Sequence, residues 1–198
     1  MALNRRERLL ETAIRLFDAN GYHATGIDRI LAEAGVAKMT LYKHFGSKEA
    51  LVLAALEERD ARTLTGLRAA VEARAGNPRD RLLAIFDWLE EWFESPDFNG
   101  CLFVKAAGEY GRRDDPIHLA ASKHQRDTLR YLRELAGEAG AARPAQLARQ
   151  LMLLFHGAVV VTQVNGPVGA GAEAARAAEA LIDQAVGTKG ALAAAGTA

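Results

Sequence analysis

Apolar residues recur every three to four positions along nearly the whole chain, and this spacing constrains the fold more than any other feature. Residues 80–94 show it clearly, with Leu82, Leu89 and Phe93 on one side of a helix. The alternation with a period of two that is typical of strands is absent, and the only β-branched run is 159–162. The pattern predicts an all-α protein of about nine helices.

Glycine and capping residues predict where the first helices begin and end. Gly21 and Gly35 are expected to end the first and second helices, and Thr25 is the expected N-cap of the second. A third short helix is expected over residues 38–44. Ser47 then caps a long fourth helix that runs into the low 70s.

The sequence AGNPRD at 75–80 is the clearest break in the helical pattern, and the composition beyond it is more aromatic. Five further helices are expected after this break. We expect one domain over residues 1–50, a second over 51–190, and a flexible tail over 191–198.

The overall charge and the cysteine count exclude several classes of protein. The chain has 25 basic and 25 acidic residues, so a nucleic-acid partner requires a local basic site. The single Cys101 excludes an internal disulfide and a cysteine-based zinc site. The N-terminal region lacks the apolar core of a secretory signal, and the apolar stretch at 151–164 looks too short to span a bilayer. We therefore expect a cytoplasmic protein with no membrane partner.

A local basic segment lies between Ala34 and Gly46, which includes Lys38, Lys43 and His44 but no acidic residue. A short helix, a tight turn containing glycine and a second short helix form a helix-turn-helix arrangement here. Because a DNA duplex presents a dense line of phosphates, the surface that faces it must lack acids and supply hydrogen-bond donors. The segment therefore predicts an N-terminal three-helix DNA-binding domain, and its third helix could contact base edges if it enters the major groove.

The side chains of this segment fall into two expected roles. Tyr42, Thr40 and Lys48 suit contacts to phosphates, whereas Lys43 and His44 can reach base edges. The complete set of predicted DNA-contacting residues is Thr25, Lys38, Met39, Thr40, Tyr42, Lys43, His44 and Lys48. A short helix that carries lysines is often only a solvated surface, and the helix-turn-helix spacing is what favours DNA.

The stretch GYHATGIDRILAEAGVAKMTLYKHFGSKEAL, residues 21–51, resembles the DNA-binding segment of the TetR/AcrR family of one-component transcriptional regulators. The resemblance implies that residues 38–44 read DNA and that Tyr42 and Lys48 hold backbone phosphates. It also implies a second, helical domain that binds a small-molecule effector, which releases the protein from a palindromic operator. Repression is the default mode of action in the family, and coupling through the long fourth helix is the expected route.

Two departures from the family pattern affect the predicted DNA contacts. Ala37 stands where the family often has a serine, which removes one hydroxyl group that would hold a phosphate. Met39 replaces a residue that is often small and so changes the expected base contact. Beyond residue 52 the resemblance is weaker, although NGCLFVKAAGEYG at 99–111 is similar to a segment found in a subset of these regulators.

The last two helices are the expected dimer interface. A single recognition helix contacts too few bases for specificity, so helix-turn-helix proteins pair to read two half-sites. Residues 147–161 are very apolar, and Gly157 and Ala158 would let a neighbouring helix approach closely. The small residues of 172–180 would do the same, which predicts a homodimer through a four-helix interface. The alternative is that residues 147–161 form the central helix of their own domain.

Aromatic and polar side chains of the middle helices are candidates for an effector site. Trp88 falls off the main apolar stripe, and His156 and Gln163 lie within an apolar helix. A cavity with a few polar groups is what a small-molecule site needs, although helical spacing of aromatics usually means core packing. The predicted contacts to a small apolar or aromatic effector are Trp88, Trp92, Phe103, Tyr110, His124, Met152, Phe155 and His156.

No pattern of residues indicates an enzyme, a cofactor or a metal site. The chain has no Gly-rich phosphate loop and no nucleophile motif, and the single pair Asp115 and His118 lacks the second copy that a di-iron bundle needs. A structural helical adaptor would not need the acid-free segment. Cys101 is favoured as a half-buried apolar residue over a redox sensor.

Overall fold

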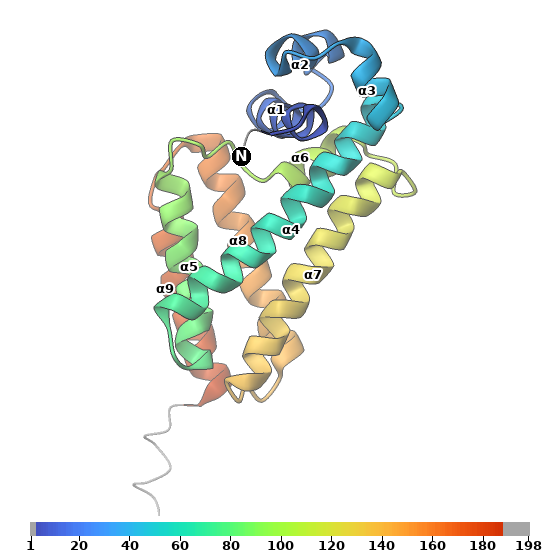
Figure 1. The fold of residues 1–198 in the computed structure, drawn as a ribbon. Helices are drawn as coiled ribbons and strands as arrows, with labels where there is room; N and C mark the ends of the chain where they lie inside the picture. The colour runs from blue at the N-terminus through green and yellow to red at the C-terminus, as the bar shows by residue number, and fades with distance from the viewer. Residues whose placement is uncertain (1–2, 188–198) are drawn as a thin grey trace, which may run out of the picture. The chain divides into compact units, whose positions relative to one another are not determined.

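A computed structural model describes residues 3–187, in which all regular structure is helical (Figure 1). Within those residues the nine helices are α1 (Arg5–Asn20), α2 (Ile27–Ala34), α3 (Lys38–His44), α4 (Lys48–Arg74), α5 (Pro78–Glu94), α6 (Leu102–Glu109), α7 (Pro116–Glu138), α8 (Pro144–Asn165) and α9 (Ala170–Val186). The all-α prediction is confirmed. The predicted tail at 191–198 lies outside the described residues.

The chain divides into two compact units, and each is discontinuous in sequence. The N-terminal unit comprises residues up to 65 together with 99–126. The C-terminal unit comprises residues 66–98 and the described chain from 127 onward. Both α4 and α7 pass from one unit to the other. The expected functional boundary at residue 50 stays a prediction, because compactness alone does not show which residues bind DNA or a ligand.

α1 is closed at both ends by local interactions in the N-terminal unit. The Asn4 side chain accepts a hydrogen bond from the Glu7 N–H at 3.0 Å, and the Glu7 carboxylate accepts one from the Asn4 N–H at 2.9 Å. Gly21 ends the helix with a φ of 82°, as predicted. The buried face of α1 packs against α2 and α3 and consists of Leu9, Leu10, Ala13, Ile14, Leu16 and Phe17.

The turn between α2 and α3 follows the prediction, but the start of α2 does not. Gly35 adopts the left-handed conformation with a φ of 63°, and the Val36 N–H donates to the Leu31 carbonyl at 3.2 Å. The N-cap of α2 is Gly26, so the prediction of Thr25 at this position is wrong. The Thr25 hydroxyl is fully buried and donates to the carbonyl of Gly21 at 2.6 Å, which closes the α1–α2 loop instead.

In the C-terminal unit, α9 packs against both α5 and α8 (Figure 1). Asn77 caps α5 by accepting from the Asp80 N–H at 3.0 Å, and Pro78 occupies the first turn. Gly171 in the first turn of α9 is buried against Glu90 of α5. This close approach places the start of α9 directly on α5.

One side of α8 is buried in the core and the other side is exposed to solvent. With 22 residues it is long and apolar enough to cross a membrane by length and composition, so the expectation that this stretch is too short was wrong. A core helix meets the same criteria, and α8 buries Leu151, Phe155 and Val159 inside the protein. Leu153 and Val164 on the other side remain exposed.

The contact between α5 and α9 predicts opposite effects of the same substitution at two glycines. A Cβ added at Gly171 would lie 1.7 Å from Glu90 Oε2 and 3.3 Å from Glu90 Cα, whereas one at Gly66 in α4 meets nothing within 4 Å. We expect Gly171→Ala to lower the free energy of unfolding by about 1–3 kcal/mol. Gly66→Ala should raise it by about 0.5–1 kcal/mol. Urea denaturation at one protein concentration measures both, and a stabilised Gly171→Ala would contradict the close approach.

Candidate nucleic-acid interface

α3 is a seven-residue helix with one side buried and the other side open to solvent. Leu41 is its only fully buried residue, and Phe45 at its C-terminal end is half-buried. The Met39 side chain is 74% exposed and Tyr42 is 43% exposed. The other residues on the open side are Lys38, Lys43 and His44, with Thr40 half-buried beside them. Except for the side that holds Leu41, the surface of α3 therefore presents hydrogen-bond donors and one large apolar side chain to solvent.

α3 carries only basic charge, and the acidic Glu33 of the neighbouring helix α2 is paired with arginines. α3 has no acidic residue in its first turn, and its last turn holds Lys43 and His44. On α2, the Glu33 carboxylate accepts hydrogen bonds from Arg15 at 2.5 Å and from Arg29 at 3.0 Å. These guanidinium groups hold the pKa of Glu33 below its usual value. Glu33 thus remains ionised, with its charge balanced by two arginines.

The start of α4 supplies the second part of the predicted interface. The Ser47 hydroxyl accepts from the Ala50 N–H at 3.1 Å, which confirms its predicted capping role. Lys48 is half-buried, and its Nζ lies 3.5 Å from the His23 carbonyl. Because cations and free amides at a helix start suit a phosphate, this position fits the role predicted for Lys48.

The predicted DNA-contacting residues all lie on α3 or at the start of α4, except for Thr25. The Thr25 side chain is buried and its hydroxyl also lies 3.3 Å from the Leu16 carbonyl, so it is not available to a phosphate. One basic residue outside the predicted set, Arg6 of α1, also lies near α3. Its guanidinium carbon lies 5.1 Å from the ring centre of Phe45, which brings the basic start of α1 beside α3. The sequence RRER at 5–8 is basic but gives no sign that it lies close to α3.

Three of the predicted effector-site residues lie in the N-terminal unit. Phe103 stacks on His124 with ring centres 3.6 Å apart and an interplanar angle of 8°. His124 Nδ1 lies 2.7 Å from Asp60 Oδ1, and both side chains are largely buried. Tyr110 instead stacks on His23 at 4.9 Å, at the loop that follows α1. Phe103 and His124 are thus in contact with each other, whereas Tyr110 contacts the loop after α1.

The other predicted effector-site residues belong to the C-terminal unit. Trp88 and Trp92 stack at 5.6 Å on α5 and are both half-buried. On α8, Phe155 and His156 contact each other edge to face at 5.5 Å, and Met152 is buried nearby in sequence. These residues occupy two separate helices, and their role in binding an effector stays a prediction.

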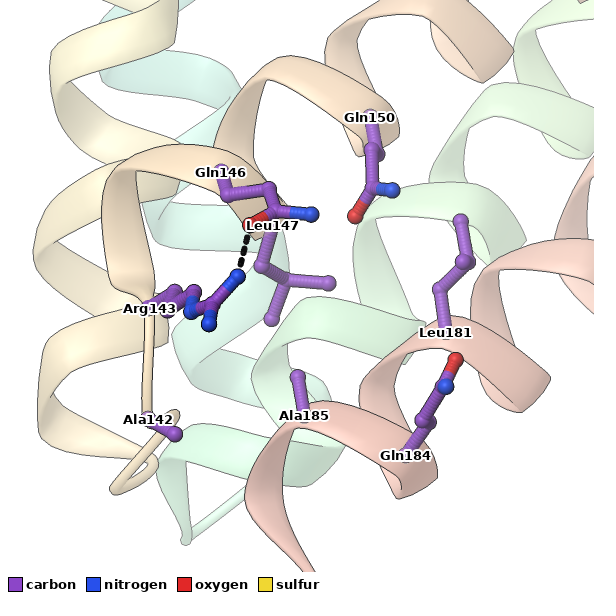
Figure 2. Close-up of a pocket in the computed structure, with 8 residues that line it drawn as sticks. All are labelled: Ala142, Arg143, Gln146, Leu147, Gln150, Leu181, Gln184 and Ala185. Carbon is purple, nitrogen blue, oxygen red and sulfur yellow. Dashed lines mark hydrogen bonds between the residues drawn. The ribbon is translucent and has the colours of Figure 1, made fainter.

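Two cavities in the C-terminal unit are lined by none of the predicted effector-site residues. The first, of about 270 Å³, lies between the start of α8 and the end of α9, where Arg143 donates to Gln146 at 3.4 Å (Figure 2). It is lined by Ala142, Arg143, Gln146, Leu147, Gln150, Leu181, Gln184 and Ala185. The second, of about 520 Å³, is bordered by the ion pair between Arg79 and Asp183.

The pair Asp115 and His118, considered in the sequence as possible metal ligands, has local structural partners. Asp115 accepts from the Ile117 N–H at 2.8 Å, and His118 Nδ1 lies 2.9 Å from the Tyr110 carbonyl. Among residues 3–187 no cluster of His, Cys, Asp and Glu suits a metal ion. Cys101 is buried, and burial raises the pKa of its thiol, which disfavours the reactive thiolate.

This arrangement defines a helix-turn-helix DNA-binding regulator. Residues 9–55 match the family model described as bacterial regulatory proteins, tetR family, and residues 78–178 match the model of a tetracyclin repressor-like C-terminal domain. The repressor NemR of Escherichia coli is 30% identical over 169 residues, which cover 81% of this chain and 84% of NemR. The chain therefore belongs to the TetR family of transcriptional regulators, which are not enzymes.

Other similar proteins extend this comparison. The activator FasR of Mycolicibacterium smegmatis is 42% identical over 90 residues, which cover 43% of this chain and only 41% of FasR. A TetR-family regulator from Streptomyces coelicolor aligns with a TM-score of 0.84 at 33% identity, covering 92% of this chain and 96% of that one. The reduced form of Escherichia coli NemR aligns with a TM-score of 0.81 at 27% identity, covering 89% and 95%.

The positions of Lys48 and Lys43 predict different effects on DNA binding. Lys48→Ala should weaken binding to all duplexes alike and reduce the slope of log affinity against log salt by about 1, because one phosphate contact is lost. Lys43→Ala should instead change the order of preference among duplexes. Arg133→Ala in the C-terminal unit removes the same charge and serves as the control. Fluorescence anisotropy at several salt concentrations measures these effects, and equal slopes for Lys48→Ala and Arg133→Ala would contradict the assignment.

Proposed function

We propose that this protein is a homodimeric repressor that binds a near-palindromic operator and is released by a small apolar or aromatic molecule. The observation that carries the DNA-binding part is the exposed, acid-free side of α3, which Leu41 holds against the rest of its unit. The name of NemR supports repression, whereas FasR is an activator, so the direction of regulation belongs to the proposal. A cytoplasmic location follows from this function.

The exposed side of α8 supports the homodimer. Leu153, Val160 and Val164 are 75%, 44% and 75% exposed, and Gly157 lies between them with open space where a Cβ would be. Their spacing of four, three and four residues is that of helices that pack side by side. Because an apolar stripe on one side of a surface helix is costly in water, a second copy of α8 is its expected partner. The exposed Ala177 of α9 would extend the same surface.

The aromatic groupings support an apolar or aromatic effector. In the N-terminal unit, the buried stack of Phe103 and His124 places an aromatic ring beside two polar groups, the imidazole and the Asp60 carboxylate. In the C-terminal unit, the half-buried Trp88 and Trp92 form a second aromatic stack. Sites for small molecules typically combine apolar walls with a few polar groups that fix the orientation of the ligand.

A mobility-shift experiment with the DNA upstream of the gene tests the proposed function. The purified wild-type protein should retard this DNA at physiological salt. The bound DNA should contain two half-sites whose centres lie about one helical turn apart. Compounds from an aromatic and aliphatic library should then release it in a dose-dependent manner. A protein that retards no duplex selected from random DNA, or one that no compound releases, would contradict the respective part of the proposal.

The exposed stripe of α8 predicts that charge at Leu153 disrupts the dimer. Leu153→Glu should give a monomer and weaken operator binding, because a carboxylate would be buried against the second copy. Leu119→Glu is the matched control, since Leu119 is 49% exposed on α7, outside the proposed interface. Sedimentation velocity measures the mass of each variant. A Leu153→Glu variant that stays dimeric would place the interface elsewhere.

A further inference from the structure

Met39 is the most exposed large apolar side chain in the described part of the N-terminal unit. It is 74% exposed, and the next such residue, Leu3, is 51% exposed. Met39 lies on the open side of α3, whereas Leu41 holds the same helix in the core. Because apolar side chains stabilise a fold by leaving water, a methionine that stays in water contributes little to the stability of this unit. Packing within the chain therefore does not explain why this position is apolar.

The other exposed side chains of α3 are polar or basic. Lys38, Lys43 and His44 are all exposed, and no acidic residue lies within the helix. Lys43 follows Met39 by four residues, so these two side chains lie on the same side of the helix, one turn apart. The open side of α3 thus offers one apolar group and, one turn further along, a cationic donor.

The major groove of DNA contains one kind of apolar group that matches Met39. Thymine has a methyl group at C5, whereas the edges of the other bases present hydrogen-bond donors and acceptors. Contact between the thioether side chain and this methyl group removes apolar surface of both from water. If Met39 faced an amino group or a carbonyl of a base instead, it would displace water without replacing the lost hydrogen bond. An exposed methionine on the DNA-reading side therefore favours thymine.

The donor one turn further along α3 fits a different base. The Lys43 ammonium can donate to O6 and N7 of guanine, which are both acceptors in the major groove. Four residues span about 6 Å along the axis of a helix. Successive bases of one strand are about 3.4 Å apart along the axis of the duplex. When α3 lies along the groove, Met39 and Lys43 therefore reach bases about two base pairs apart.

We propose that Met39 is a specificity-determining residue that contacts the C5-methyl group of a thymine in each half-site, about two base pairs from a guanine that Lys43 contacts. The inference rests on the proposed function, because it names the bases that the open side of α3 selects. This role differs from that of Tyr42 and Lys48, whose predicted contacts to phosphates carry no sequence information.

Removal of single methyl groups from the DNA tests the proposal. A duplex is selected from random DNA with the full-length wild-type protein, and each thymine is then replaced by uracil, which lacks only the C5-methyl group. At one thymine in each half-site, the replacement should weaken binding about fourfold, as expected for one buried methyl group. Replacement in both half-sites should weaken binding about fifteenfold, because independent effects multiply. Fluorescence anisotropy at one salt concentration measures these affinities.

Three protein variants show whether Met39 makes this contact. Met39→Ala should bind the thymine and uracil duplexes equally well. Met39→Leu keeps an apolar side chain and should retain part of the difference. Leu119→Ala is the matched control, because it shortens another exposed apolar side chain of the same unit and should retain the full fourfold difference.

The outcomes separate this inference from the proposed function. If the wild type binds the selected duplex and every uracil replacement is neutral, the contact with thymine is overturned, whatever the variants do. The same conclusion follows if Met39→Ala remains as sensitive to uracil as Leu119→Ala. If Lys43→Ala keeps the preference for guanine two base pairs away, the assignment of Lys43 is wrong. A wild type for which no duplex can be selected would overturn the proposed function itself.

Discussion

The packing of Leu41 is the interaction on which the DNA-binding surface depends. A helix of seven residues is not stable by itself in water, because its nucleation is costly and it forms few hydrogen bonds. α3 exists because Leu41 is fully buried where α3 packs on α1 and α2. That one buried position also fixes the rotation of the helix, so that Met39, Tyr42 and Lys43 point to solvent. The burial of Leu41 therefore both stabilises α3 and determines which of its side chains face solvent.

The same division between a buried and an open side recurs on a larger scale in α8. Leu151, Phe155 and Val159 fill the core, while Leu153 and Val164 leave an apolar stripe that no other part of residues 3–187 covers. A regulator that reads two half-sites needs two copies of α3 at a fixed spacing. In the proposed function, the exposed side of α3 binds DNA, and the exposed apolar stripe of α8 joins the two subunits of the dimer.

Local sequence signals predicted the helices well, and long-range contacts account for what was missed. The stops at Gly21 and Gly35 and the cap at Ser47 depend only on neighbouring residues, and all three are confirmed. Thr25 was predicted as the N-cap of α2 because threonine is a common N-cap residue, but its buried hydroxyl donates to the Gly21 carbonyl instead. Glu109 accepts hydrogen bonds from the amides of Tyr22 and His23, which lie 87 and 86 residues away in sequence, and no periodicity predicts such a contact.

Oxidation of Met39 by hydroxyl radicals, with and without bound DNA, tests the central claim most directly. Met39 is the 74% exposed methionine of α3, whereas Met152 is buried at 8% exposure and serves as an internal reference. If α3 enters the major groove, a saturating duplex should slow the formation of sulfoxide at Met39 several-fold and leave Met152 unchanged. Equal rates at Met39 in the free and DNA-bound protein would show that another surface binds DNA.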